Sequence, residues 1–579
     1  MSDLNENLRK LARKGILRPE LRVGVVSFVK SYVVHINLRD AGNPSGTHFE
    51  GGRYGKGEVG EFVLVEGQRS ILLGRIIEVR LPEGERHTVS QNYAGSNDLD
   101  AIGHIQLLGS ISMTDFHFTP GVDNYPRLGD RVYAAPHQLI ALIPYLMTKT
   151  EDGDTPVQLE LGAVGDAIES KVSITPEKLF GRHCAILGAT GGGKSWTTAR
   201  IIEECIKHKG KIILLDATGE YGDFSGAEVT HCHLGEPVHK TERSIACSIP
   251  PTSFEESDFL ALFQPSGKVQ GPKLREAIRS LRLAKICPEL ADGGLIVKEN
   301  RSKSKIHSKI SEKEIGKKLD NPTQEFDVIL LSRQIYEECV YPDGYGKDYT
   351  KWGAQDGNYT HCLSLITRIN SVISSVAYKC VFAETTDEAI TDLIRKFIKE
   401  DKNLLCICLS GIQHEFYARE IIANTIGRYL LSIARQGEFK TNPAVVFVDE
   451  AHNFLGRQIG SEDMFSRLDA FELIAKEGRK FGLNICLATQ RPRDITEGVL
   501  SQMGTLVVHR LTNDRDREIV ERACGEIDLS ASSFLPNLQP GEAAIIGVDF
   551  PFPLAIQISR PTYRPRSDGP NYQKHWRAE

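Results

Sequence analysis

The residues best suited to chemistry begin at Gly188, where eight residues read GATGGGKS. This stretch fits the spacing G-x-x-x-x-G-K-[ST], in which glycines let the backbone curl until its N–H groups surround phosphate oxygens. A lysine at the seventh position reaches the β- and γ-phosphates, and the hydroxyl after it binds Mg²⁺. The stretch therefore predicts a site for a nucleoside triphosphate with Mg²⁺, and ATP is the nucleotide that we expect.

The flanking sequence supports this interpretation over a chance match. An apolar run at residues 183–187 predicts a strand before the glycines, and residues 195–207 predict a helix after them. Ser195 is the metal ligand expected within this segment. The residues that we assign to nucleotide binding are Gly188, Ala189, Thr190, Gly191, Gly192, Gly193, Lys194, Ser195 and Trp196.

A pair of acids forms the second element of the predicted site. The apolar run 444–448 ends in Asp449 and Glu450, which describes a buried strand that delivers carboxylates to its C-terminal edge. We expect Asp449 to hold the hydrated Mg²⁺ and Glu450 to polarise the attacking water as a general base. A phosphate loop alone also fits a kinase or a GTPase, so this pair favours an ATPase; a simple polar turn is the alternative.

Two further polar residues are candidates for the same site. Gln490 follows the predicted strand 484–488 and is the candidate sensor of the γ-phosphate or the water, although such a residue is also a common cap. Arg479 lies in the segment EGRKFG at the end of a predicted helix. It is a candidate arginine finger, with an ordinary surface arginine as the alternative.

The elements that must position these residues alternate between strand and helix. Strand-like runs occur at residues 183–187, 211–215, 404–409, 444–448, 484–488, 505–509 and 542–547. This order predicts an α/β fold with a mostly parallel sheet and right-handed crossovers.

The regions around this core have their own patterns. Short β-rich runs at 23–38, 62–79, 104–111 and 131–135 alternate with turn residues and predict a small antiparallel barrel. Residues 253–401 are mostly helical, as at 273–286 and 385–399, and we interpret them as an insertion in the core. The charged piece 298–318 within this insertion is interpreted as a solvated helical face or loop rather than a DNA contact.

Composition limits the class of protein. The chain has 579 residues, 40% of them hydrophobic and 25% charged, with a net charge of −6 that argues against coating nucleic acid over the whole surface. Its 12 cysteines include no CxxC pair, and Cys406 and Cys408 are expected to be buried structural thiols. The polar N-terminus and the lack of a long apolar run favour a cytoplasmic protein without a membrane partner.

Together these motifs resemble those of the HerA family, in the FtsK and HerA branch of RecA-like ATPases. The resemblance includes GATGGGKS, residues 216–221 (DATGEY), the VFVDEAH segment, EGRKFG, the ATQRP strand end and residues 535–543 (LPNLQPGEA). It implies a RecA-like P-loop NTPase core, a homo-hexamer with ATP between subunits, and DNA in a central pore. It also implies that Arg479 and Arg182 are catalytic arginines, and leaves open which of them reaches the neighbouring subunit.

The resemblance also divides the chain. It implies an N-terminal barrel at 1–155, a core in two parts at 156–252 and 402–560 around the insertion at 253–401, and a tail at 561–579 that braces or crosses onto an adjacent subunit. A partner effector, such as a nuclease or a sirtuin-like NAD hydrolase in anti-phage defence, would dock on the barrel.

The expected function is an ATP-driven DNA translocase or helicase. A ring that mainly assembles and activates a partner enzyme, and a conjugation or secretion ATPase at a membrane, are the two alternatives.

Overall fold

A computed structural model describes residues 15–31, 33–38, 47–81, 101–114, 116–148, 156–165, 170–237, 239, 241, 243–384, 386–455, 457–461, 464–523, 534–548, 550, 552–567, 572 and 576. The chain forms two compact units. The first unit contains Met1–His208, Gln490–Arg493 and Leu500–Thr562, and the second contains Lys209–Thr489, Asp494–Val499 and Tyr563–Glu579.

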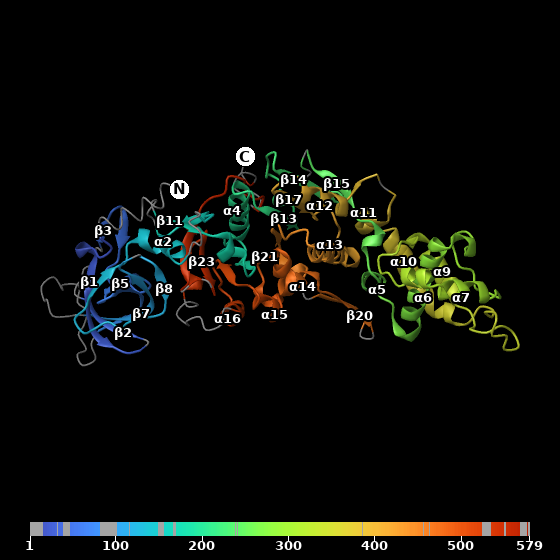
Figure 1. The fold of residues 1–579 in the computed structure, drawn as a ribbon, viewed down its shortest axis with the longest axis horizontal. Helices are drawn as coiled ribbons and strands as arrows, with labels where there is room; N and C mark the ends of the chain where they lie inside the picture. The colour runs from blue at the N-terminus through green and yellow to red at the C-terminus, as the bar shows by residue number, and fades with distance from the viewer. Residues whose placement is uncertain are drawn as a thin grey trace. The chain divides into compact units, whose positions relative to one another are not determined.

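The first unit begins with a small antiparallel barrel, drawn in blue and cyan in Figure 1. Its strands follow the order β2-β1-β9-β5-β6-β7, and pairing of β2 with β7 closes the barrel. Alternate side chains along the strands point inward and form one apolar core. The predicted barrel is thereby confirmed. Its elements are η1 (Pro19–Leu21), β1 (Arg22–Val29), β2 (Val34–Leu38), β5 (Phe62–Glu66), β6 (Ser70–Arg80), β7 (Ala101–Ser112) and β9 (Arg131–Ala134), with β3 (Thr47–Phe49), β4 (Gly52–Tyr54) and β8 (Phe118–Pro120) beside them.

The rest of the first unit contains a mixed sheet in the order β11-β10-β24-β23-β22-β12. Strand β12 pairs parallel with β22, whereas β23 pairs antiparallel with both β22 and β24, so this end of the sheet is antiparallel. The strands are β10 (Leu159–Ala163), β11 (Lys171–Ile174), β12 (Cys184–Leu187), β22 (Thr505–Val508), β23 (Glu542–Gly547) and β24 (Leu554–Ile558). The helices are α2 (His137–Leu146), α3 (Pro176–Phe180), α4 (Lys194–Lys207), α16 (Asp514–Ala523) and η10 (Leu535–Asn537).

The second unit contains a sheet in the order β21-β18-β13-β17-β14-β15-β16, whose described pairings are all parallel. Every side chain of β13 is buried, as expected for a parallel strand covered on both faces. The strands are β13 (Lys211–Asp216), β14 (Val229–Leu234), β15 (Ile245–Ser248), β16 (Glu388–Ala389), β17 (Leu404–Cys408), β18 (Ala444–Val448) and β21 (Leu483–Thr489). The other core elements are α12 (Ile390–Lys399), η6 (Glu415–Tyr417), α13 (Ala418–Arg435), η7 (Ala451–Asn453), the hairpin β19 (Arg457–Ser461) and β20 (Met464–Leu468), α14 (Ala470–Glu477) and η8 (Gly478–Phe481).

Between β15 and β16 the described chain is helical, drawn in green and yellow in Figure 1. The helix predicted over 385–399 begins only at Ile390, because 388–389 pair with β15 instead. Within the described residues, each helix is too short or too polar to cross a bilayer. The helical elements are η2 (Pro251–Ser253), α5 (Glu256–Phe263), α6 (Gly267–Ile286), η3 (Pro288–Leu290), α7 (Ser304–Ser311), α8 (Lys313–Leu319), η4 (Val328–Leu330), α9 (Leu331–Glu338), α10 (Asn358–Ile373), η5 (Val376–Tyr378) and α11 (Lys379–Phe382). Two elements, η9 (Pro492–Asp494) and α15 (Glu497–Leu500), lie in the stretch where the chain passes between the units.

Candidate nucleotide-binding site

The glycine-rich segment, here called the P-loop (residues 188–195), joins β12 to α4 in the first unit. Gly191 and Gly193 have positive φ values of 77° and 111°, a region that residues with a Cβ rarely adopt. The first turn of α4 closes at once, because the Thr197 N–H donates to the Gly193 carbonyl at 2.9 Å. The loop is thus shaped so that backbone N–H groups and the positive end of α4 can meet an anion.

The two residues expected to contact phosphate and metal lie in the first turn of α4. Lys194 is buried at the first helical position, and Ser195 and Trp196 after it are both half-buried. Burying an ammonium group is costly unless anions or acceptors surround it, and a bound phosphate is such a group. The side chain expected to bind phosphate therefore lies in a position that fits that role.

His509, just after β22, supports the P-loop from behind. A Cβ on Gly188 would lie 2.6 Å from the Cβ of His509, so only glycine fits at this position. The His509 Nδ1–H donates to the Glu542 carbonyl at 2.8 Å, which leaves Nε2 to accept from the Thr197 hydroxyl at 2.8 Å. Burial lowers the pKa of His509 to about 4, with Lys194 adding to the effect, so the imidazole is neutral at physiological pH.

The segment 535–543 meets the P-loop at Gly541. The Gly541 N–H donates to the Gly192 carbonyl at 3.3 Å, and a Cβ on Gly193 would lie 3.3 Å from the Gly541 Cα. Gly541 itself has a φ of 83° and so belongs to a tight turn. The segment 535–543 therefore forms part of the wall that fixes the P-loop.

Gln490 and Arg182 also belong to the first unit. The Thr190 hydroxyl of the P-loop donates a hydrogen bond to Gln490 Oε1, so the structure brings the candidate sensor to the P-loop. Arg182 is exposed, and its carbonyl accepts from the Gly504 N–H at 2.7 Å. A Cβ on Gly504 would lie 2.3 Å from the Arg182 Cβ, so Gly504 leaves the space that this arginine needs.

The acidic pair lies in the second unit, at the C-terminal edge of its parallel sheet. Asp449 is only 2% exposed, and its N–H donates to the Leu215 carbonyl at 3.2 Å. Glu450 adopts the left-handed conformation (φ 46°, ψ 47°), which non-glycine residues adopt mainly at functional sites or tight turns. The His452 Nδ1 lies 3.3 Å from Glu450 Oε2 and 3.2 Å from the Thr489 hydroxyl. This ring therefore orients the carboxylate of the expected general base.

Asp216 ends the neighbouring strand β13 at the same edge. Its carboxylate accepts hydrogen bonds from the backbone N–H groups of the next turn, with distances from 2.7 Å at Gly219 to 3.3 Å at Thr218. Burial raises the pKa of Asp216 to about 6, although these hydrogen bonds oppose the shift. Asp216 thus fixes the turn of the DATGEY motif beside the acidic pair.

Arg479 lies in η8, which follows α14, and its side chain is exposed. In the part of the chain that the structure describes, its guanidinium makes no ion pair. It belongs to the second unit together with Asp449 and Glu450, whereas Arg182 belongs to the first. Both arginines are therefore exposed groups that can meet another molecule.

Sequence reasoning gave no role to His509 and no specific contact to Gly541. A signal for His509 was present, because the strand-like run 505–509 ends in a histidine. The parallel register pairs Leu187 with Val508, so His509 comes level with Gly188. Without that register, a histidine at a strand end is indistinguishable from an ordinary polar cap.

These features define a class of protein. A glycine loop between a strand and a helix, with two acids after a buried parallel strand, makes the chain a P-loop nucleoside triphosphatase. Residues 159–425 match the family model described as the central domain of helicase HerA. This part of the chain is therefore similar to the HerA family, and the chain is an ATP hydrolase.

Curated relatives carry related names. A probable helicase of Methanocaldococcus jannaschii is 23% identical over 408 residues, which cover 69% of this chain and 70% of that protein. The DNA double-strand break repair helicase HerA of Pyrococcus furiosus is 23% identical over 535 residues, covering 86% of this chain and 87% of that protein. Among solved structures, the bacterial conjugative coupling protein TrwB is 14% identical with a TM-score of 0.43, covering 74% of this chain and 94% of that one.

Proposed function

We propose that the protein is an ATP-driven DNA translocase or helicase that works as a ring of six copies. The observation that carries this proposal is the intact hydrolytic set, from the buried Lys194 of the P-loop to the oriented Glu450. A protein that only bound ATP would not need a general base. Relatives named as DNA double-strand break repair helicases support DNA as the substrate.

Each residue has a stated role in this proposal. The P-loop N–H groups and Lys194 bind the phosphates, and Ser195 with Asp449 holds Mg²⁺, which when bound draws charge from the phosphate oxygens. Glu450, oriented by His452, takes a proton from the attacking water, and Gln490 positions that water or the γ-phosphate.

Arg182 and Arg479 neutralise charge that develops in the transition state, one of them from a neighbouring copy. In a ring, hydrolysis at one interface then changes the contacts of the adjoining subunit. This coupling is what turns chemistry into movement along DNA.

Displacement of streptavidin from biotinylated DNA tests the proposal. The purified chain should displace streptavidin only with ATP and Mg²⁺. The Glu450→Gln variant should bind nucleotide but leave streptavidin on the DNA. Lys194→Ala is the matched control that cannot bind ATP tightly. ATP turnover that never displaces streptavidin, from single- or double-stranded DNA, would contradict a motor function.

An apolar patch on the barrel favours a second function, in which the ring assembles and activates a partner effector such as a nuclease or an NAD hydrolase. Phe28, Tyr125 and Leu128 are all exposed, Leu128 by 70%. Their chain segments lie side by side, because the Tyr125 hydroxyl donates to the Ser31 carbonyl at 3.0 Å and the Gly129 N–H donates to the Val26 carbonyl at 2.9 Å. Exposed apolar clusters of this kind commonly mark protein interfaces.

The native mass of the particle, with and without the product of the adjacent gene, tests this second function. Substituting Phe28 and Leu128 with serine should abolish the mass added by the partner and leave ATP turnover unchanged. A partner that remains bound to this variant would exclude the patch as its docking site. An anti-phage role is a separate question, tested in cells that carry this gene and the adjacent one.

A further inference from the structure

The connection between α9 and α10 exposes several tyrosines. We call residues 340–355 the tyrosine loop. Tyr345 is fully exposed, Tyr349 is 69% exposed and Tyr341 is 55% exposed. Aromatic side chains lose favourable burial when they stand in water, so three of them in one short segment indicate a surface that binds something.

The tyrosine loop is built from regular backbone contacts. Val340 bridges to Gln355 and Gly344 bridges to Asp348, which closes the loop on itself. A third bridge joins Lys351 to Ser302, and the Lys303 N–H donates to the Thr350 carbonyl at 2.9 Å. The tyrosines are therefore displayed on a fixed framework beside residues 301–303.

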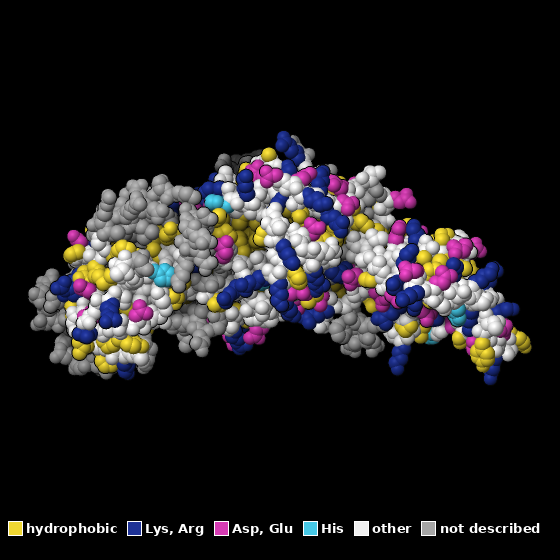
Figure 2. Space-filling model, in the orientation of Figure 1, with side chains coloured by type: hydrophobic (Ala, Val, Ile, Leu, Met, Phe, Trp, Pro, Cys, Tyr) yellow, Lys and Arg dark blue, Asp and Glu magenta, His cyan; other side chains and the backbone are white. Residues whose placement is uncertain are grey.

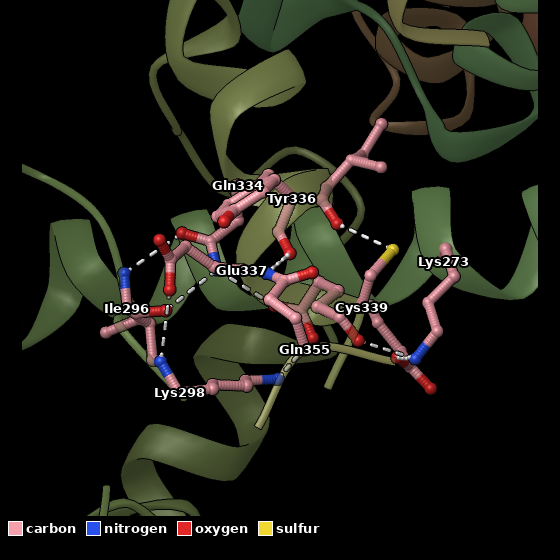
Figure 3. Close-up of polar contacts among 11 residues, drawn as sticks. Lys273, Ile296, Lys298, Gln334, Tyr336, Glu337, Cys339 and Gln355 are labelled. Carbon is pink, nitrogen blue, oxygen red and sulfur yellow. Dashed lines mark hydrogen bonds and ion pairs between the residues drawn. The ribbon is translucent and has the colours of Figure 1, made fainter. Parts of the chain in front are cut away.

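Polar contacts fix the base of the tyrosine loop, as Figure 3 shows. Lys298 pairs with the buried Glu338, and its ammonium lies 5.4 Å from the centre of the Trp352 ring. The Gln355 side chain donates to the Tyr336 carbonyl at 3.0 Å, and Lys273 donates to the Glu338 carbonyl at 2.7 Å. A loop anchored in this way loses little conformational entropy when it binds a ligand.

Basic side chains are interleaved with the tyrosines. Lys347 and Lys351 lie within the loop, and Arg301 lies in the adjacent segment, with the Trp352 N–H donating to its carbonyl at 3.0 Å. All three basic side chains are exposed, and within the described residues none of them forms an ion pair. Figure 2 shows Lys and Arg side chains, with Asp and Glu among them, over the surface where Figure 1 places α6, α7 and α9.

We propose that the tyrosine loop and Arg301 bind single-stranded nucleic acid, in contrast to the sequence interpretation of residues 298–318 as a solvated face or loop rather than a DNA contact. Bases stack on exposed aromatic rings without regard to sequence, and neighbouring lysines and arginines contact the phosphates. The cores of protein interfaces are depleted in lysine, so this mixture fits nucleic acid better than a protein partner or a second copy of the chain. The inference rests on the proposed function for its choice of DNA as the substrate, and it adds a contact surface outside the nucleotide site.

Fluorescence anisotropy with the full chain and a labelled oligothymidine of about 30 nucleotides, long enough for several stacked bases, tests the binding. Tyr345→Ala and Tyr349→Ala should each weaken binding by at least about fivefold, because stacking contributes that much per base. Tyr345→Phe and Tyr349→Phe keep the aromatic ring and should bind as the wild type does. Tyr125→Ala, which removes an exposed tyrosine of the barrel, is the matched control.

The salt dependence of binding tests the basic residues separately. Substituting Lys347 and Lys351 with glutamine should make the plot of log affinity against log salt less steep, by about 0.7 for each phosphate that the variant no longer neutralises. Photocrosslinking with 5-bromodeoxyuridine should attach the oligonucleotide within residues 340–355. Basal ATP turnover without DNA should be the same in all of these variants.

The possible outcomes separate failure of this inference from failure of the proposed function. If the wild type displaces streptavidin while the tyrosine variants bind normally and no crosslink falls in the loop, the inference is wrong and the motor function stands. If the wild type binds no DNA at all, both fail. If the variants lose a protein partner or change the native mass but keep their oligonucleotide affinity, the surface binds protein and the inference is also overturned.

Discussion

The Nε2 atom of His509 lies 2.8 Å from the Thr197 hydroxyl, which joins the end of one strand to the helix that begins at the P-loop. The two residues are far apart in sequence, and both are buried. Since His509 also fills the space behind Gly188, it fixes the P-loop from the side away from the nucleotide.

Replacing His509 with alanine should therefore weaken ATP binding more than it slows the chemical step. The change opens a cavity and leaves the Thr197 hydroxyl without its acceptor, at a cost of about 1–3 kcal/mol for the unpaired group alone. Steady-state kinetics should show a KM for ATP raised about tenfold or more, a binding loss of about 1.4 kcal/mol, with a smaller fall in kcat. Thr197→Ser keeps the hydroxyl and should behave as the wild type, and an unchanged KM in the alanine variant would rule out this supporting role.

Acid should destabilise the fold through the same histidine. The pKa of His509 falls from 6.5 in the unfolded chain to about 4 in the folded one, mainly because of burial. The unfolded state therefore binds the proton first, and stability present above about pH 6.5 is lost as the pH falls toward about 4, by up to about 3 kcal/mol. The thermal midpoint of the wild type should drop over this window more than that of His509→Gln, and parallel curves would contradict the assignment.

Asp216 should be needed for the shape of its turn. Its Oδ2 accepts a hydrogen bond from the Tyr221 N–H at 3.1 Å, whereas its Oδ1 accepts from the N–H groups of residues 218–220. Asp216→Asn keeps one oxygen acceptor and leaves a buried N–H unpaired, which should cost about 1–3 kcal/mol. Urea unfolding measures this loss, and Asp223→Asn, which changes an exposed acid nearby, is the comparison.

Lys194 and Glu450 should fail in different ways. Lys194→Ala should remove tight ATP binding, because its ammonium is the buried charge of the P-loop. Glu450→Gln should keep binding and lower kcat by about 10²–10⁴-fold, the usual contribution of a general base. Calorimetry with an ATP analogue and a phosphate-release assay separate the two, and equal turnover by wild type and Glu450→Gln would remove Glu450 from this role.

Mixed rings should show which arginine crosses an interface. Arg182→Ala or Arg479→Ala should each lower turnover, by about 10³-fold or more for a true arginine finger. If one of these arginines acts on the neighbour's nucleotide, mixing its alanine variant with Glu450→Gln chains creates some interfaces that have both an intact arginine and an intact Glu450. Activity then returns. An absence of rescue for both variants would count against a shared site.

Much of the fold and of the candidate site follows from local sequence. Gly191 and Gly193 stand where the backbone has positive φ, and the strands β13 and β18 each contain a continuous apolar run. Steric limits on φ and the burial of both sheet faces act on neighbouring residues, so such patterns are legible without a structure. The order of the motifs also indicated the resemblance to the HerA family, which the match of residues 159–425 supports.

Other features needed the folded chain. The helix predicted from residue 385 starts later, because 388–389 pair with a strand well before them in sequence. Thr190 contacts Gln490 across 300 residues, and Tyr563 donates to the Ser225 carbonyl across 338, although the tail has no periodic pattern. Register and packing between distant segments decide such contacts, and composition does not encode them.

The sequence by itself determined a glycine loop between a strand and a helix and two acids after a buried strand, because those properties depend on residues next to one another. Only the tertiary structure decided that His509 supports the P-loop and that the tyrosines of residues 340–355 stand on an anchored base. The physical reason is that burial and pairing across long separations are set by how the whole core packs.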